Sequence, residues 1–300
     1  MDGKIIGRCR LCDSKKLIQI INFGKIPLGN NLLLKKKLSK KAKKYPLILN
    51  NCKLCNHFQL NYSVNPKVLY AKNYTYLSGT GKSMVVHLKK YADFIVKKIN
   101  LKKNSIVLDI GSNDGTCLLN FKKRGMTVLG IDPAKKPCEE AKKKGVNTIN
   151  NFFNKETAKK VLKLHGKVDF LTSHNTLAHI DNLNSIFENI YHVLKKDGYF
   201  CFEVGYFQKV LENNYFDTIY HEHLDYHHAN PIVNFLINLG FSIIDINEVK
   251  IQGGSLRILC KKDNKKNISK KAFLFLKKEK KKVIFNKKFI MNWEKKIKNI

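Results

Sequence analysis

The sequence predicts an α/β protein with a mostly parallel central sheet, a small cysteine-rich module before it and a helical tail after it. Three observations support this prediction. Strand patterns alternate with helical patterns from residue 106 onward, a glycine turn follows the first strand, and two Cys-x-x-Cys pairs precede residue 60. We expect a metal-binding domain over residues 1–65, an α/β domain over 66–262 and a tail over 263–300.

Two cysteine pairs indicate a metal site near the N-terminus. A Cys-x-x-Cys pair places two thiolates on one tight turn, and two such pairs are typical of a tetrahedral zinc site. The predicted ligands are Cys9, Cys12, Cys52 and Cys55. Four cysteines leave no open coordination position, so we predict a structural zinc; His57, just outside the second pair, is an alternative ligand.

Strands and helices then follow in order. After a lysine-rich stretch at 35–44 and an aromatic linker at 70–83, apolar residues from Val85 to Ile99 have helical spacing. Expected strands cover 106–110, 127–131, 146–149, 168–172 and 199–204, and expected helices cover 115–124, 135–144, 155–163 and 183–194. Asp197-Gly198 predicts the turn into the fifth strand. A helix at 230–239, a hairpin of strands at 242–249 and 256–261, and a helical tail from residue 264 complete the chain.

The glycine turn after the first strand indicates which nucleotide the α/β domain binds. A dinucleotide fingerprint requires two further glycines after the first, so that the backbone can approach the pyrophosphate. Asn113 and Thr116 occupy those positions after Gly111. A ligand without pyrophosphate needs no such approach, so the pattern favours S-adenosylmethionine over NAD. We therefore predict a Rossmann-like class I methyltransferase sheet.

Several residues at the carboxyl ends of the expected strands are candidates for this cofactor site. Asp132, about twenty residues after Gly111, is expected to accept hydrogen bonds from the ribose hydroxyls. Either Phe152 or Phe153 is expected near the adenine, with a plain core role as the alternative. The candidate cofactor residues are Gly111, Ser112, Asn113, Asp132, Pro133, Phe152, Phe153 and Asn175.

Composition narrows the function classes. The net charge of +34 resembles that of a nucleic-acid-binding protein, but only 4 of the 57 basic residues are arginine, and lysine is spread along the chain. This pattern favours a solvated lysine surface over a dedicated nucleic-acid face. No apolar run approaches the ~20 residues of a membrane helix. The first ten residues lack the apolar core of a signal peptide, so we expect a cytoplasmic protein.

A histidine-rich segment follows the fifth strand, at the sheet edge where α/β proteins bind ligands. Tyr220, Glu222 and His223 place a phenol, a carboxylate and an imidazole within four residues. Imidazole titrates near neutrality, so His223 is a candidate general base, oriented or charged by Glu222, with Tyr220 bonded to a substrate oxygen. Two alternatives remain for this segment. It could be a purely structural loop, or it could bind a metal through His221, His223, His227 and His228.

The chain resembles the nucleotide-sugar C-3-methyltransferases, which methylate a sugar carbon next to a ketone. The resemblance covers residues 9 to about 260. Its motifs are the four-cysteine module, Tyr74-x-Tyr76-x-Ser78-Gly79, Ile110-Gly-Ser-Asn-Asp-Gly115, Gly130-Ile-Asp-Pro133, Asn175-x3-His179-Ile180, Phe216-Asp-Thr-Ile-Tyr-His-Glu-His-Leu224 and Gly253-Gly-Ser-Leu-Arg257.

This resemblance implies a reaction and its residues. It implies a nucleotide-linked 4-keto-6-deoxysugar as substrate, S-adenosylmethionine as methyl donor, and an enolate formed by loss of the C3 proton. His223 would be the base, assisted by Tyr220 and Glu222, and His179 and Tyr76 would line the active site. Members of the family carry a third domain that helps to bind the nucleotide. The tail from residue 264 is interpreted as the helix leading into such a domain.

Two other functions remain open from the sequence. A nucleic-acid methyltransferase would use the zinc module and lysines to hold phosphates, but it leaves the histidine-rich segment without a role. Enzymes that methylate base amino groups carry an Asn-Pro-Pro-aromatic motif after the fourth strand. This chain reads His174-Asn-Thr-Leu177 at that place. A non-catalytic cofactor-binding remnant is the second alternative. The sequence does not determine the oligomeric state.

Overall fold

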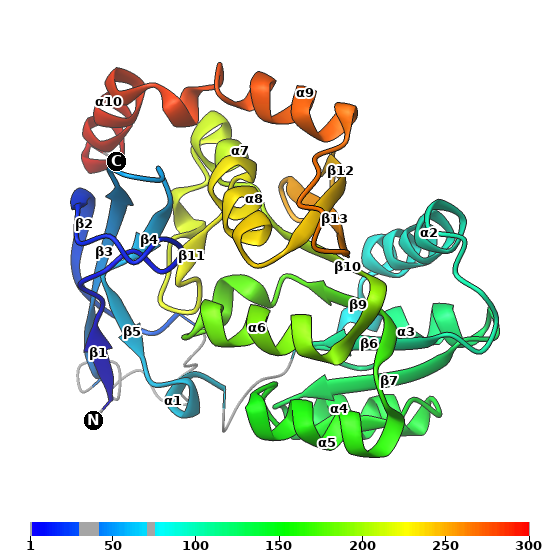
Figure 1. The fold of residues 1–300 in the computed structure, drawn as a ribbon. Helices are drawn as coiled ribbons and strands as arrows, with labels where there is room; N and C mark the ends of the chain where they lie inside the picture. Colours follow the sequence, from blue (N-terminus) through cyan, green and yellow to red (C-terminus); the bar gives the residue numbers. More distant parts are fainter. Residues whose placement is uncertain (1, 30–41, 71–75, 300) are drawn as a thin grey trace.

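The computed structural model describes residues 2–29, 42–70 and 76–299, which form sheets of seven, four and two strands (Figure 1). Most of the lysine-rich stretch at 35–44, and Tyr74 of the aromatic motif, lie outside the described residues. Among the described residues, no helix combines the length and apolar character needed to span a bilayer.

The central sheet has seven strands in the order β12-β13-β10-β9-β6-β7-β8. The pairs β6–β7, β7–β8, β6–β9 and β9–β10 are parallel, whereas β13 runs antiparallel to both β10 and β12. The strands are β6 (Ile106–Ile110), β7 (Thr127–Asp132), β8 (Thr148–Asn150), β9 (Val168–His174), β10 (Leu194–Gly205), β12 (Phe241–Val249) and β13 (Ser255–Lys262). This arrangement confirms the predicted Rossmann-like sheet with its closing antiparallel hairpin.

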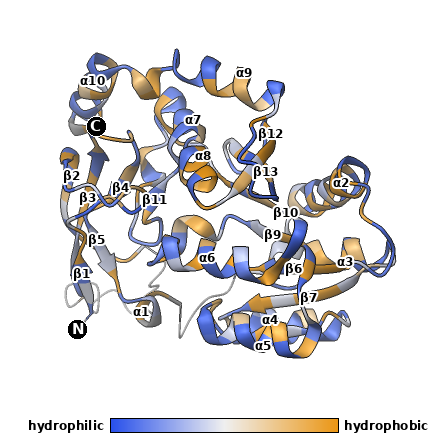
Figure 2. Cartoon of the chain, in the orientation of Figure 1, coloured by the Kyte–Doolittle hydropathy of each residue, from blue (hydrophilic) through white to orange (hydrophobic). Residues whose placement is uncertain are grey.

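Helices cover both faces of this sheet, each burying an apolar face against the strands. Figure 2 shows the hydrophobic residues gathered on strands such as β7 and on helices such as α8. The α-helices are α1 (Pro66–Tyr70), α2 (Lys82–Lys98), α3 (Thr116–Lys122), α4 (Lys135–Lys143), α5 (Lys155–His165), α6 (Leu183–Val193), α7 (Phe207–Asn213), α8 (Ala229–Asn238), α9 (Lys270–Glu279) and α10 (Lys287–Lys298). Short 3-10 turns are η2 (Ser78–Thr80), η3 (Leu177–His179), η4 (Phe216–Thr218) and η5 (Val283–Phe285).

The expected fifth strand differs from the observed one. β10 begins at Leu194, and Asp197-Gly198 lies inside it, at an irregularity in its pairing with β9. Asp197 has a φ of +64°, so this pair makes a kink within the strand instead of a turn before it. The helix α7 was not expected from the sequence.

The second sheet belongs to the N-terminal module but includes one strand, β11, from the α/β part of the chain. Its order is β11-β4-β3-β2, and the separate pair β1–β5 lies beside it. The strands are β1 (Gly3–Ile5), β2 (Leu17–Pro27), β3 (Lys44–Cys52), β4 (Phe58–Leu60), β5 (Tyr62–Val64) and β11 (Asp225–Tyr226). Because β11 begins two residues after His223, the module is hydrogen-bonded to the histidine-rich segment.

The C-terminal tail folds back onto the N-terminal module. In Figure 1, α9 crosses above α7 and α8, and α10 lies over β2 and β3. Ile290 and Trp293 of α10 share one buried apolar cluster with Ile21 and Leu47 of the N-terminal sheet. The buried apolar residues of α10 are therefore covered by the N-terminal module of the same chain.

Glu279, at the end of α9, attaches this tail to helix α8. Its buried carboxylate accepts hydrogen bonds from the backbone N–H groups of Ala229 and Asn230, both at 2.8 Å. The Tyr206 hydroxyl donates to it at 2.8 Å, and His228 Nδ1 lies 3.3 Å away. A carboxylate at a helix N-terminus satisfies unpaired N–H groups and interacts favourably with the helix dipole.

We expect Glu279→Gln to destabilise the fold by about 1.5–3 kcal/mol, the usual contribution of a hydrogen bond to a charged group, because the amide keeps only one of the two oxygens that accept from α8. Burial alone would raise the pKa of Glu279, but the bonds from His228 and α8 outweigh it and lower that pKa to about 2. This carboxylate therefore contributes stability above about pH 4.5, and the contribution is lost as the pH falls toward 2. Urea unfolding at pH 7 and pH 3 measures both effects, with exposed Glu139→Gln as control. Equal stability of Glu279→Gln and wild type at pH 7 would contradict this expectation.

Candidate functional site

The four predicted cysteine ligands converge at one point. Their Sγ atoms all lie within 4.8 Å of one another. Cys9 Sγ is 3.5 Å from Cys55 Sγ, and Cys12 Sγ is 3.6 Å from Cys52 Sγ. Tetrahedral zinc with Zn–S bonds of ~2.3 Å separates its sulfurs by roughly 3.8 Å, so this donor set fits zinc. No other such group of metal-binding side chains occurs among the described residues.

The two cysteine pairs have the same local structure. Asp13 and Asn56 follow the second cysteine of each pair with φ of +57° and +66°. Their backbone N–H groups donate to the carbonyls of Cys9 and Cys52, at 2.9 and 2.8 Å. Aspartate and asparagine tolerate this left-handed conformation better than most residues. These tight turns point both thiols of each pair to one side.

The glycine turn after β6 requires Gly111. Its φ is +73°, and a Cβ at this position would lie 2.0 Å from Thr176 Oγ1. Thr176 belongs to the turn that follows β9, so a glycine at position 111 lets the ends of β6 and β9 approach closely. Asn175, in the same turn, also has a positive φ of +53°. Two predicted site residues, Gly111 and Asn175, are thereby brought to one edge of the sheet.

Asp132 ends β7 beside this turn. Its carboxylate accepts the backbone N–H of Asn113 at 2.9 Å and that of Ala134 at 2.8 Å. Burial raises the pKa of Asp132, and these two N–H bonds oppose that rise. A carboxylate has about four acceptor positions, so two remain for other donors such as hydroxyl groups.

A short segment preceding α2 lies over the glycine turn. Asn113 Oδ1 accepts the Ser78 N–H at 2.9 Å, and Asn113 Nδ2 donates to the Tyr76 carbonyl at 3.0 Å. Asp114 accepts the Gly79 N–H at 3.0 Å and the Lys144 ammonium at 2.7 Å. Asn113 and Asp114 thus anchor this segment. The half-exposed Tyr76 side chain is hydrogen-bonded to Gln252 and Ser78.

His223 has a defined tautomer in the histidine-rich segment. Its Nδ1 lies 3.0 Å from the Thr218 carbonyl, which can only accept, so Nδ1 carries the proton. Nε2 then has a lone pair and accepts the Tyr220 hydroxyl at 3.2 Å. Burial lowers the pKa of His223 below 6.5, partly opposed by the Thr218 carbonyl, so the ring is neutral at pH 7. The geometry supplies a neutral imidazole whose Nε2 lone pair accepts a hydrogen bond from a phenol.

His179 joins this cluster from the turn after β9. Its ring centroid is 4.9 Å from that of His223, while Tyr220 is 4.3 Å from His223. Burial and the neighbouring His223 lower the pKa of His179 to about 3, against the carbonyls of Glu222 and Asn175, which contact its ring. His179 therefore links the histidine cluster to the edge that carries Asn175. Glu222 itself is buried, and the group that orients the His223 ring is the Thr218 carbonyl.

Two other histidines of the segment, His221 and His228, are hydrogen-bonded to distant parts of the chain. His221 Nε2 lies 3.2 Å from the Tyr45 carbonyl of β3, and His228 contacts Asn56 and Glu279. No metal-binding group includes these histidines among the described residues. The metal-binding alternative for this segment therefore finds no support in the geometry.

Comparison with known proteins identifies the family of this fold. Residues 86–246 match the family model described as "Methyltransferase domain", which covers more than half of the chain. The chain belongs to the methyltransferase-domain family. Residues 9–70 match a second model, described as "Putative zinc binding domain". The predicted methyltransferase fold, its S-adenosylmethionine-binding character and the zinc-binding module are thus confirmed.

Two curated relatives and one solved structure are similar to this chain. C-methyltransferase NovU of Streptomyces niveus is 30% identical over 85% of this chain and 60% of its own length. Carboxy-S-adenosyl-L-methionine synthase of Desulfotalea psychrophila is 29% identical over 38% of this chain and 62% of its own length. The PH0226 protein of Pyrococcus horikoshii has a TM-score of 0.51 at 16% identity, covering 66% of this chain and 99% of that one, which supports the fold alone. The chain spans about 60% of the length of these curated relatives.

The residues around the glycine turn fit S-adenosylmethionine. Ser112 Oγ is buried there without a hydrogen-bond partner, so it remains available to a ligand. Phe152 is 39% exposed just after β8, whereas Phe153 is buried in the core. Of the two candidates for the adenine, Phe152 is therefore the exposed one and Phe153 is a core residue. Pro133 lies next to Asp132 at the same edge.

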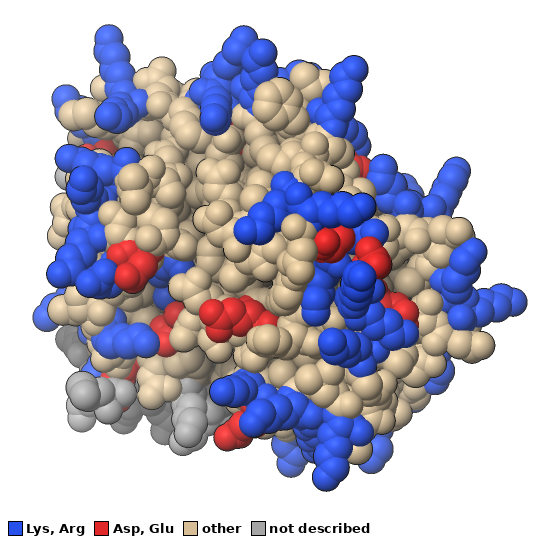
Figure 3. Space-filling model, viewed as in Figure 1, with Lys and Arg blue, Asp and Glu red and all other residues tan. Residues whose placement is uncertain are grey.

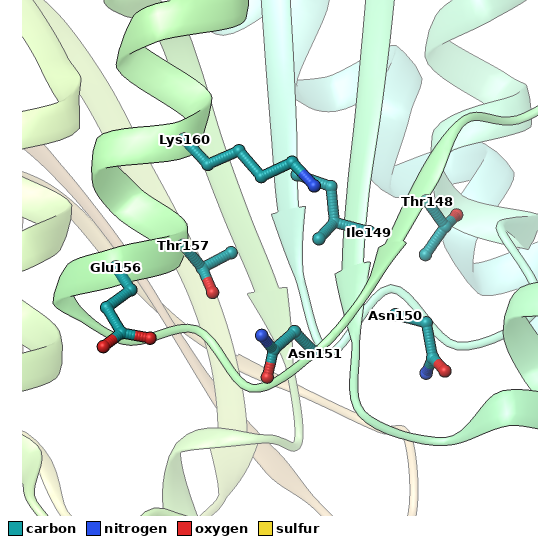
Figure 4. Close-up of a pocket in the computed structure, with 7 residues that line it drawn as sticks. All are labelled: Thr148, Ile149, Asn150, Asn151, Glu156, Thr157 and Lys160. Atoms are coloured by element: carbon teal, nitrogen blue, oxygen red, sulfur yellow. The ribbon is translucent and has the colours of Figure 1, made fainter.

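A surface hollow of about 480 Å³ lies near Phe152, between β8 and the start of α5 (Figure 4). Figure 4 shows Lys160 extending from α5 toward Ile149 of β8. The residues that line the hollow are Thr148, Ile149, Asn150, Asn151, Glu156, Thr157 and Lys160. None of the candidate catalytic residues lines this hollow, so it is separate from the histidine cluster.

We expect Asp132→Ala to weaken the binding of S-adenosylmethionine about 10–100-fold, because a hydrogen bond to a charged group contributes ~1.5–3 kcal/mol. Titration calorimetry measures the affinity. Asp93→Ala, which removes an exposed carboxylate on α2, is the matched control. Unchanged affinity in Asp132→Ala would show that the ribose assignment is wrong.

Sequence reasoning missed a buried ionic cluster near the cofactor edge. His174, Glu203 and Arg257 are paired across β9, β10 and β13. Glu203 Oε1 accepts Arg257 Nε at 2.6 Å, while Oε2 is 2.6 Å from His87 Nε2 and 3.2 Å from His174 Nδ1. Burial would raise the pKa of Glu203, but these partners hold it well below its usual range. The available signal was that ionisable residues lie near the ends of β9 and β10 and near the start of antiparallel β13, and this signal requires the strand order to be recognised.

Basic side chains are numerous on the face of the molecule shown in Figure 3. Figure 3 shows Lys and Arg side chains scattered over the whole visible face, with acidic side chains in small groups between them. Many lysines are paired with carboxylates, as in Lys4–Asp181 and Lys195–Asp169.

Proposed function

We propose that this protein is an S-adenosylmethionine-dependent C-methyltransferase acting on a nucleotide-linked 4-keto-6-deoxysugar at C3, through an enolate. The single observation that carries the proposal is the fixed tautomer of His223, whose Nε2 lone pair lies beside the Tyr220 hydroxyl. A carbon must lose a proton before it can be methylated, and a neutral imidazole is suited to remove it. The C-methyltransferase name of the Streptomyces niveus relative supports this class of reaction.

The base operates through its two ring nitrogens. The ketone at C4 acidifies the C3 proton, and His223 Nε2 takes that proton directly or through the Tyr220 hydroxyl. The Thr218 carbonyl then stabilises the resulting imidazolium, because it already accepts the Nδ1 proton. Bound S-adenosylmethionine supplies an electrophilic methyl group on its sulfonium. Gly111, Ser112, Asn113, Asp132 and Asn175 would hold it at the edge where His179 meets Asn175.

Polar groups around the base would stabilise the enolate oxygen. His179 remains neutral because its pKa is about 3, so it would act as a hydrogen-bonding group and not as a cation. Tyr76, half-exposed on the cofactor side, would contact the sugar or the developing oxyanion. Loss of one such donor typically costs ~2.7–4 kcal/mol of barrier. Glu222 is buried next to His223 and would assist the base electrostatically.

Sequential titration calorimetry tests this function. The zinc-loaded protein is titrated with S-adenosylmethionine, and a TDP-4-keto-6-deoxysugar is then added to the saturated complex. Binding of both ligands supports the proposal, and mass spectrometry then checks for a methylated sugar. Binding of the cofactor without the sugar would reject this substrate. Absence of cofactor binding would contradict methyltransferase activity altogether.

A further inference from the structure

One buried carboxylate connects the zinc module to the histidine-rich segment. Asp225, two residues after His223, is fully buried and forms β11, where it pairs with Gln59 of β4. Arg10 Nε donates to both of its oxygens, at 2.9 and 3.0 Å. His57 Nε2 lies 2.8 Å from Oδ1 of the same carboxylate. Asp225 therefore has a partner in each half of the four-cysteine module.

The positions of these partners tie them to the metal site. Arg10 lies inside the first cysteine pair, directly after Cys9, and its own N–H donates to Gln59 Oε1 at 2.8 Å. His57 comes two residues after Cys55, and its carbonyl accepts the Cys52 N–H at 2.8 Å. Both cysteine turns must be formed for Arg10 and His57 to meet at one carboxylate.

Arg10 also reaches the other half of the histidine cluster. Its Nη2 donates to the Ile180 carbonyl, directly after His179. Its Nη1 is 4.0 Å from Asp181 Oδ1. The planar guanidinium thus spans the chain after His179 and the chain after His223. Only 6% of the Arg10 side chain is exposed, so water does not compete for these bonds.

A buried ion pair is weak support for stability, because desolvation of both charges offsets their attraction. The planar guanidinium of an arginine, however, holds several N–H donors in fixed directions. It therefore fixes the relative positions of the acceptor groups that it binds. The two segments that Arg10 joins carry rings whose centroids are 4.9 Å apart, and proton transfer requires such groups to be held accurately.

We propose that Arg10 is a positioning residue through which the four-cysteine module holds His179 and His223 in register. This inference rests on the proposed function for its kinetic consequence. It assigns the zinc module a role in substrate deprotonation in addition to its own folding. Its structural consequence does not depend on the substrate.

The test compares Arg10→Lys with Arg8→Ala. Lysine keeps the charge but cannot span Asp225 and the Ile180 carbonyl together. Arg8 lies on the other side of Cys9, and its half-exposed side chain is bonded only to Asp13 among the described residues, so loss of this side chain is the matched control. Zinc content and S-adenosylmethionine affinity are expected to match wild type in both variants.

Two readouts distinguish positioning from general stability. Amide hydrogen exchange in residues 177–181 and 218–226 is expected to be faster in Arg10→Lys and unchanged in Arg8→Ala. Exchange of the sugar C3 proton with deuterated water is expected to slow about 10²-fold in Arg10→Lys, as displacements of about 1 Å can cause, mainly through kcat and with little change in KM.

Wild-type rates in both readouts for Arg10→Lys would overturn the inference. If Arg10→Lys does not fold, the double variant Arg10→Gln with Asp225→Asn removes both buried charges and is measured in the same way. Wild-type protein that fails to exchange the C3 proton would contradict the proposed function, and the amide-exchange readout would still test Arg10.

Discussion

Replacing His223 with asparagine is expected to lower kcat about 10²–10⁴-fold, the usual contribution of a positioned general base. Asparagine cannot take the C3 proton at neutral pH, although its amide can still bond to the Thr218 carbonyl. Binding of S-adenosylmethionine is expected to be unchanged, because the bonds of the glycine turn do not involve His223. The exposed His165→Asn is the matched control.

Proton exchange at C3 in deuterated water, measured by NMR without S-adenosylmethionine, reports this step directly. If His223→Asn still exchanged the proton at the wild-type rate, His223 would not be the base. The pH profile of wild type gives a second check. Because burial lowers the pKa of His223, kcat/KM is expected to rise through a pKa below 6.5 and to stay level above it. Protonation at lower pH removes the lone pair that the reaction needs.

Replacing Cys52 with serine is expected to abolish stoichiometric zinc binding and to unfold the N-terminal module. Structural zinc contributes ~10–16 kcal/mol in small zinc-binding peptides, which is as large as the ~5–15 kcal/mol stability of a typical domain. β11 pairs with β4 of this module, so the histidine-rich segment is expected to lose its docking as well. Metal analysis and thermal unfolding by circular dichroism measure these effects.

Cys260→Ala provides the control for this experiment. Cys260 is buried in the main sheet, where its thiol contacts the Phe200 carbonyl, and it is not one of the clustered cysteines. Its loss is expected to leave zinc content unchanged and to cost ~1 kcal/mol. A Cys52→Ser protein that kept one zinc per chain and the wild-type Tm would disprove a structural role for the metal.

Local patterns were sufficient to predict the elements that depend on neighbouring residues. Short apolar runs indicated every strand of the central sheet, because burial on both faces of a sheet selects nearly continuous apolar residues. The glycine turn could be recognised because Gly111 must avoid Thr176, which restricts the residue type at that position. Element ends were less accurate: β10 begins at Leu194, since Asp197-Gly198 kinks the strand without ending it.

The sequence by itself determined the fold class, the four-cysteine module and the turn that follows β6, because each depends on short-range spacing. Only the tertiary structure decided which groups act on the candidate site residues. Arg10 and Asp225 are 215 positions apart, and Glu203 gathers partners from three other elements. The tautomer of His223 depends on a backbone carbonyl, which no residue type reveals. Such contacts form when distant segments pack together, and their energies depend on burial and geometry that the sequence does not display.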